Sequence, residues 1–157
     1  MKKIIIIFFI LSLTVSYSQD CRYIKNEVDE FTGKKVVKTD WYDLKTKDGL
    51  YIMLRNINKR KSIVFTLDRD LGCAVSYKGR KSAAKIKLEN GVIVSFYHNA
   101  KTDCGDFTLI GRLTENDIKK LKESPIKTIR FNGTKYYHDT KDVAFKTFFI
   151  DKIDCVK

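Results

Sequence analysis

The residues of this sequence best suited to chemistry are cations that gather in two short turns. They are Lys59, Arg60, Lys61, Lys78, Arg80 and Lys81. Arginine can hold a phosphate or carboxylate through two parallel hydrogen bonds, and lysine adds a compact positive charge. The six cations are therefore a candidate anion-binding site. The competing interpretation is that turns are exposed and that their lysines are only solvated.

No other residue set matches a known catalytic, cofactor-binding or metal-binding pattern. His98 and His138 are the only histidines, and both are expected to be surface or strand-end residues and not catalysts. The sequence has no serine in a nucleophile elbow and no glycine-rich phosphate loop. Asp103 and Asp106 flank Gly105 but lack the alternating oxygen ligands of a calcium loop. We therefore expect no catalytic residue, no metal and no cofactor.

Four cysteines predict two disulfides: Cys21, Cys73, Cys104 and Cys155. An even number of cysteines in an exported chain is typical of a disulfide framework. A zinc site is the alternative. Zinc ligands cluster in short pairs such as C-x-x-C, however, and these cysteines stand far apart, so disulfides are favoured.

Residues 1–18 have the pattern of a cleavable secretory signal. The segment opens with two lysines, continues with the apolar stretch Ile4–Val15 and ends in Ser16–Ser18. The apolar stretch is too short to span a membrane, and no later run is longer. Cleavage before Gln19 would reduce the net charge of +12 by two, and such a surplus favours anionic partners. We expect an exported chain, periplasmic or secreted; an uncleaved anchor or a buried strand is the alternative.

Short β-branched and aromatic runs between turn residues predict one mainly β domain over residues 19–157. The expected strands are 22–28, 35–44, 50–57, 62–67, 73–77, 84–88, 92–98, 107–113, 126–131 and 134–138. Strand alternation places Trp41 and Tyr42 on opposite sides of a strand, so at least one of them should belong to the core.

The turn at Asn90-Gly91 predicts a hairpin whose register can be chosen. A two-residue loop would set Leu88 opposite Ile93. A three-residue loop with Gly91 left-handed sets Leu88 opposite Val92, and it places all the apolar residues of both strands on one face. Because a slip of one residue turns a strand inside out, we choose the three-residue loop.

Two short helices are expected to cover part of the sheet. Thr114 and Asp117 form a capping box, followed by core positions at Ile118 and Leu121, and the helix ends before Pro125. Phenylalanines at helical spacing predict a second helix over residues 144–154, with a phenylalanine-rich strand as the alternative.

A simple up-and-down meander makes a further prediction, because alternate turns then lie at the same end of the sheet. It brings the two cationic turns together, and it separates Cys73 from Cys104 by about one strand length, roughly 17 Å. A disulfide needs Cα atoms within about 7 Å. The meander therefore predicts the pairs Cys21–Cys73 and Cys104–Cys155, against Cys73–Cys104, the bond between cysteines that are near each other in the sequence.

Three segments together carry a resemblance to a known family: residues 26–34, 85–91 and 113–130. The sequence resembles a family of small exported bacterial proteins that carry a signal peptide and have no assigned function. The resemblance implies export and a single domain, and it implies no catalytic residues.

These observations predict an α+β fold, mainly antiparallel β as a meander sheet or sandwich, with two short helices. The function we expect is that of a non-enzymatic binding or envelope accessory module. Its partner would be anionic: an anionic polymer such as a polysaccharide or nucleic acid, a lipid headgroup or an acidic protein. A secreted hydrolase or inhibitor, and a structural envelope component, are the alternatives.

Overall fold

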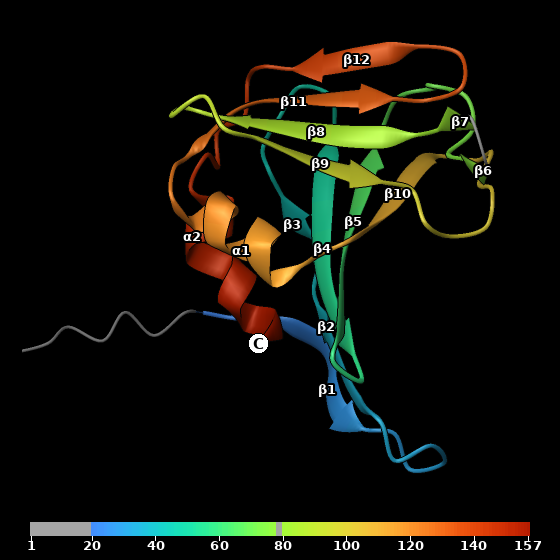
Figure 1. Ribbon diagram of the computed structural model, residues 1–157, viewed down its shortest axis with the longest axis vertical. Coiled ribbons are helices and arrows are strands. Elements are labelled where there is room, and N and C mark those ends of the chain that lie inside the picture. The colour runs from blue at the N-terminus through green and yellow to red at the C-terminus, as the bar shows by residue number, and fades with distance from the viewer. Residues whose placement is uncertain (1–19, 78–79) are drawn as a thin grey trace, which may run out of the picture.

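The computed structural model describes residues 20–77 and 80–157, and Figure 1 shows how their strands are arranged. The expected signal, residues 1–18, lies outside the described residues, as does Lys78. The fold is mainly antiparallel β with two short helices, which confirms the expected α+β class.

The larger sheet has the strand order β1–β2–β4–β5–β10, and the short β3 also pairs with β4. Its strands are β1 (Tyr23–Val28), β2 (Lys35–Thr39), β3 (Tyr42–Asp43), β4 (Leu50–Ile57), β5 (Arg60–Leu67) and β10 (Phe107–Arg112). All neighbouring strands are antiparallel. Alternate residues such as Leu54 of β4 and Phe65 of β5 are fully buried, and they define the inner face of this sheet.

A second sheet packs against that inner face and lies across the top of the molecule in Figure 1. Its order is β12–β11–β8–β9. The strands are β8 (Ala83–Leu88), β9 (Ile93–Tyr97), β11 (Ile126–Asn132) and β12 (Tyr137–Thr140). The ring of Phe65 lies 5.8 Å from that of Phe96 and 5.6 Å from that of Phe131, between ring centroids. The two sheets therefore share one core.

The hairpin of β8 and β9 has the predicted register. Ala84 pairs with Phe96, Ile86 pairs with Val94, and the amide of Leu88 donates to the carbonyl of Val92 at 2.9 Å. Gly91 has a φ of 87°, the left-handed conformation that the three-residue loop requires.

Helix α1 (Glu115–Lys122) begins with the predicted capping box. The Thr114 hydroxyl accepts from the amide of Asp117, and the Asp117 carboxylate accepts from the amide of Thr114. Ile118 and Leu121 are buried as expected. On the inner side of the larger sheet the chain closes with α2 (Phe148–Lys152) and a 3₁₀ turn, η1 (Ile153–Val156).

The second helix begins later than the predicted residue 144. The amide of Phe145 donates to the carbonyl of Leu44, and the carbonyl of Lys146 accepts from the amide of Ile126. Because these backbone groups are used in tertiary contacts, residues 144–146 cannot form the first helical turn.

Strand boundaries also differ from expectation in three segments. The run 35–44 divides into β2 and β3, because the Asp40 carboxylate accepts from the amide of Trp41 and turns the chain. Only Ser76–Tyr77 of the run 73–77 is a strand, β6, which pairs with β7 (Arg80–Lys81). The strand expected at 134–138 is shifted to β12.

Tyr42 is buried and Trp41 is exposed, as the alternation of the pair predicted.

All four cysteines form disulfides, but the predicted pairing is wrong. The bonds are Cys21–Cys155 and Cys73–Cys104. The chain is not a simple meander, because β10 returns to pair with β5 after β8 and β9 have entered the second sheet. Ala74 and Asp103 then form an antiparallel bridge, so Cys73 and Cys104 face each other at a Cα distance of 4.1 Å.

The other face of the larger sheet is the outer face, which carries polar residues such as Arg55 and Ser62 at one end and apolar residues such as Val64 further along. Figure 1 shows both helices on one side of β4 and β5.

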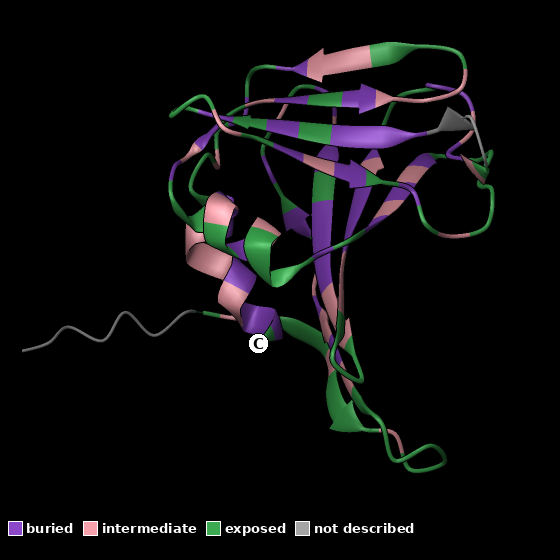
Figure 2. Ribbon diagram, viewed as in Figure 1, coloured by how far each residue is buried: buried purple, intermediate pink, exposed green. Residues whose placement is uncertain are grey.

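The arm formed by β1 and β2 projects from the body and is largely exposed in Figure 2. At its tip, Phe31 is 98% exposed.

Candidate anion-binding face

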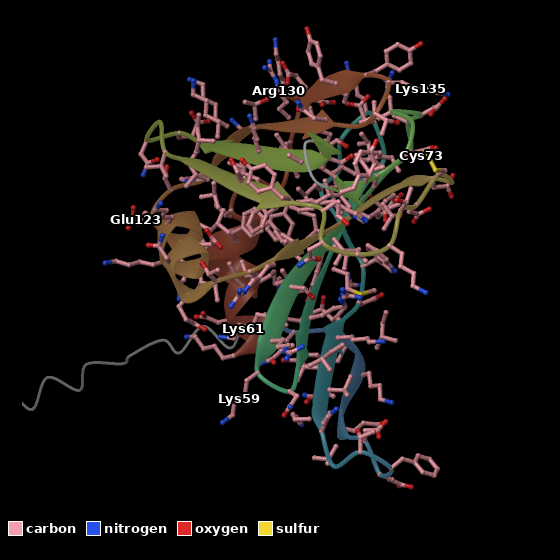
Figure 3. All side chains as sticks on the ribbon, turned by 45° about the vertical axis from the view of Figure 1, so that its right-hand side comes forward. Lys59, Lys61, Cys73, Glu123, Arg130 and Lys135 are labelled. Carbon is pink, nitrogen blue, oxygen red and sulfur yellow. A yellow bond between two sulfur atoms is a disulfide. The ribbon has the colours of Figure 1, made fainter. Side chains whose placement is uncertain are left out.

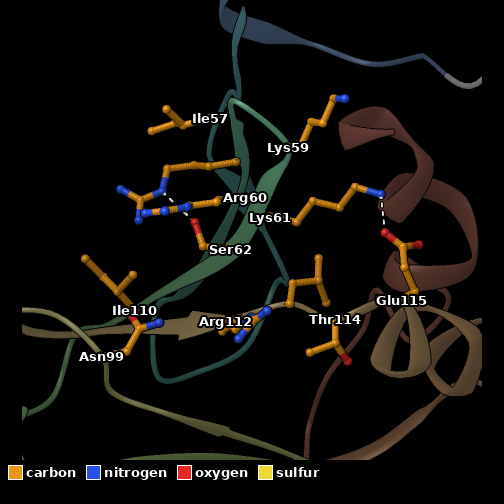
Figure 4. A pocket seen from close by; sticks show the side chains of 12 residues that line it. Ile57, Lys59, Arg60, Lys61, Ser62, Asn99, Ile110, Arg112, Thr114 and Glu115 are labelled. Carbon is orange, nitrogen blue, oxygen red and sulfur yellow. Dashed lines mark hydrogen bonds and ion pairs between the residues drawn. The ribbon is translucent and has the colours of Figure 1, made fainter. Parts of the chain in front are cut away.

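A groove of about 770 Å³ lies at the lower end of β5, between β4, β10 and the start of α1 (Figure 4). Its lining residues include five cations: Arg55, Lys59, Arg60, Lys61 and Arg112. Glu115 is the one acidic residue among them. We refer to this site as the basic groove.

The turn between β4 and β5 explains why Lys59 and Arg60 reach the groove. Asn58 and Lys59 have positive φ angles of 49° and 68°, which is the conformation of a two-residue hairpin turn whose twist matches that of its strands. Lys59 therefore lies exposed at the tip. Arg60 begins β5 on the outer face, opposite Ile57.

Arg55 and Arg112 come to the groove through strand register. Arg55 of β4 pairs with Ser62 of β5, and Ser62 pairs in turn with Arg112 of β10. The Nε atom of Arg55 donates to the Ser62 hydroxyl at 3.2 Å, which orients the guanidinium. The two arginines therefore flank one serine on the same face of three adjacent strands.

Charge in the groove is largely uncompensated. Lys61 is held by Glu115 at 2.8 Å, in the first turn of α1 (Figure 4). Among the residues that the structure describes, no carboxylate lies within 4.0 Å of the charged atoms of the other cations: Arg55, Lys59, Arg60 and Arg112. Burial lowers the pKa of the half-buried Arg55 guanidinium, but arginine remains charged in proteins.

Of the six predicted cations, the structure describes three in full, and the backbone of β7 lies far from them. Lys59, Arg60 and Lys61 line the basic groove. Figure 3 labels Lys59 and Lys61 low in the molecule. It labels Cys73, which comes shortly before β6 in the chain, high on the right. The backbone of β7, which holds Arg80 and Lys81, lies beside β6 at the upper right of Figure 1. Their side chains and all of Lys78 lie outside what the structure describes.

Arg55 and Arg112 were not predicted as site residues. Both strands that hold them were predicted, but the two arginines belong to no cationic turn and come together only on one face of neighbouring strands. The signal was present in the alternation of β4, where Arg55 and Ile57 fall on the face opposite to Ile52 and Leu54.

His98 has a structural role. Its ring is buried, and its Nδ1 accepts from the amide of Ile110 at 3.2 Å while Nε2 contacts the carbonyl of Lys101 at 2.9 Å. A ring that accepts at Nδ1 and donates at Nε2 is neutral. His98 therefore fastens the segment after β9 to β10.

His138 belongs to a second polar cluster at the other end of β5. Its Nε2 donates to Asp48 at 2.6 Å, and Arg69 binds the other oxygen of Asp48, also at 2.6 Å. Burial raises the pKa of the Asp48 carboxyl, but the hydrogen bonds from His138 and Arg69 outweigh it, so the pKa lies below its ordinary value. The side-chain hydrogen bonds of this cluster involve no serine, threonine or cysteine.

Within residues 20–77 and 80–157, no group of three histidine, cysteine or acidic side chains is placed to hold a metal ion. None of the helices in that part of the chain is long and apolar enough to cross a membrane. Comparisons with protein-family models, curated proteins and solved structures found no match to this chain.

Proposed function

We propose that the protein is an exported, non-enzymatic binding module that holds anionic groups of its partner in the basic groove. The observation that carries the proposal is the group of four cations without carboxylate partners, two of which, Arg55 and Arg112, flank Ser62 in one line across three strands. Arginines fixed by a sheet can hold a phosphate, sulfate or carboxylate with little loss of side-chain freedom.

Export is part of this proposal. The signal-like pattern of residues 1–18 supports it, and so do the two disulfides, which persist in oxidising compartments. Membership of the family of small exported bacterial proteins that the sequence resembles is proposed on the same grounds.

Heparin chromatography of the chain from Gln19 tests the binding function. The variant Arg55→Gln/Arg112→Gln removes two charges from the groove. Its control, Lys85→Gln/Lys87→Gln, removes two exposed charges from β8 in the second sheet. We expect the groove variant to elute at clearly lower salt than the wild type and the control, since binding by charge weakens as salt screens it.

Circular dichroism and thermal unfolding of all three proteins show whether the variants are folded. A third variant, Arg55→Lys/Arg112→Lys, keeps the charge but loses the planar fork, and it should elute between the wild type and the glutamine variant. If the folded glutamine variant elutes together with the control, the groove does not bind anions and the proposal is wrong.

A further inference from the structure

The line of cations in the basic groove continues across the whole larger sheet. Arg55 pairs with Lys38 of β2, and Lys38 pairs with Lys25 of β1. One register line therefore crosses five strands. Its members, which we call the basic row, are Lys25, Lys38, Arg55, Ser62 and Arg112.

A β-bulge in β1 determines which residue of that strand belongs to the row. Tyr23 pairs with Thr39, but Lys25 pairs with Lys38, so Ile24 is an extra residue in β1. Thr39 is fully buried on the inner face, and its neighbour Lys38 is therefore on the outer face. The bulge aligns Lys25 with Lys38 instead of with an inner residue.

Like charges directly opposite each other destabilise a sheet, and the row contains two such pairs: Lys25 with Lys38, and Lys38 with Arg55. Lys25 is partly compensated by Glu27, at 2.9 Å. Within the described parts of the chain, Lys38, Arg55 and Arg112 have no carboxylate within 4.0 Å. Anionic groups of a ligand would relieve this repulsion.

The shape of the row indicates the shape of the ligand. Neighbouring strands lie about 4.8 Å apart, so five strands span roughly 19 Å. A single phosphate or sulfate is only a few ångström across and is too small to contact the whole row. A ligand that uses the whole row must be a linear polymer with repeated anionic groups, and it must lie across the strands.

The groove also indicates what the polymer backbone is. Proteins that bind single-stranded nucleic acid combine a basic channel with aromatic rings on which the bases stack. Among the described residues that line the basic groove none is aromatic, and the apolar ones are Ile57, Ile110 and Leu113. The groove therefore offers charge and aliphatic contact, which suits an anionic polysaccharide.

We propose that the basic row is an extended binding site for a linear anionic polysaccharide that lies across β1, β2, β4, β5 and β10. This inference rests on the proposed function, because Arg55 and Arg112 belong to both sites. It adds Lys25 and Lys38, which lie outside the groove. It also specifies that the ligand is a polysaccharide and that its chain runs across the strands.

Calorimetric titration with heparin oligosaccharides of defined length tests the row. The probes are a disaccharide and an oligomer longer than the row. The variant Lys25→Gln/Lys38→Gln should bind the long oligomer about tenfold more weakly than the wild type, since two exposed ion pairs are lost. It should bind the disaccharide as the wild type does. The Lys85→Gln/Lys87→Gln control should keep wild-type affinity for both probes.

The remaining outcomes separate the two proposals. If the lysine variant binds the long oligomer like the wild type while Arg55→Gln/Arg112→Gln loses affinity, the row is wrong and the groove stands. If the arginine variant also binds normally, both are wrong. Tighter binding of an oligothymidylate than of heparin, with quenching of the fluorescence of Trp41, the single tryptophan, would contradict the polysaccharide and favour nucleic acid.

Discussion

Asp48 is a buried carboxylate whose contacts link stability to pH. It is 8% exposed, and it binds both His138 and Arg69 through separate oxygens. These contacts join the turn before β4 to the segment after β5 and to β12. Because they favour the ionised carboxylate over the neutral one, they connect the stability of the fold to pH.

The substitution Asp48→Asn should lower the free energy of unfolding at pH 7 by about 1–3 kcal/mol, the range for a lost charged hydrogen bond. The folded-state pKa of Asp48 is depressed, so its contribution is present above its unfolded pKa of about 3.9 and disappears as the pH falls through the lower folded value. Urea unfolding at several pH values measures this. The wild type and the variant should differ at pH 7 and converge as the pH falls below the depressed folded-state pKa of Asp48; a difference that is constant with pH would contradict the assignment.

At the scale of elements, the approach of β10 to β9 depends on Gly111. A Cβ atom at this position would lie 2.7 Å from the Cβ atom of Phe96, which is buried in the shared core. Gly105 offers a matched control, because a Cβ atom there would meet only an oxygen of Asp103 at 3.7 Å.

The substitution Gly111→Ala should therefore lower the free energy of unfolding by about 1–3 kcal/mol, as overpacking of a core does. Gly105→Ala should change it by less than about 0.5 kcal/mol. Thermal or urea unfolding of both variants checks the difference. Equal stabilities would mean that the two sheets can separate at β9 without cost.

Local patterns predicted the elements of this fold better than their arrangement. The hairpin at Gly91 and the capping box of Thr114 were correct, because short-range chemistry determines a turn and a helix start. The disulfides were paired wrongly, because the return of β10 to β5 is a long-range event that no local signal records. Arg55 and Arg112 were missed for the same reason, since only the register with Ser62 brings them together.

At the scale of the whole molecule, the packing of the two sheets and the two disulfides stabilise the larger sheet, whose outer face carries the basic row. Cys21–Cys155 joins the segment before β1 to the 3₁₀ turn η1, and the hydroxyl of Tyr23 donates to the carbonyl of Cys155 at 3.1 Å. The bond closes almost the entire described chain, with a sequence separation of 134. It therefore holds the base of the β1–β2 arm, and Lys25 with it, against the body.

The most direct test of the account is to map where the polysaccharide binds. Amide chemical shifts of the folded chain from Gln19 would be followed by NMR during titration with the long heparin oligomer. We expect the largest changes along the basic row, at Lys25, Lys38, Arg55 and Arg112, and little change at Lys85 on the second sheet. Changes confined to the second sheet, or no changes at all, would contradict an anion-binding outer face.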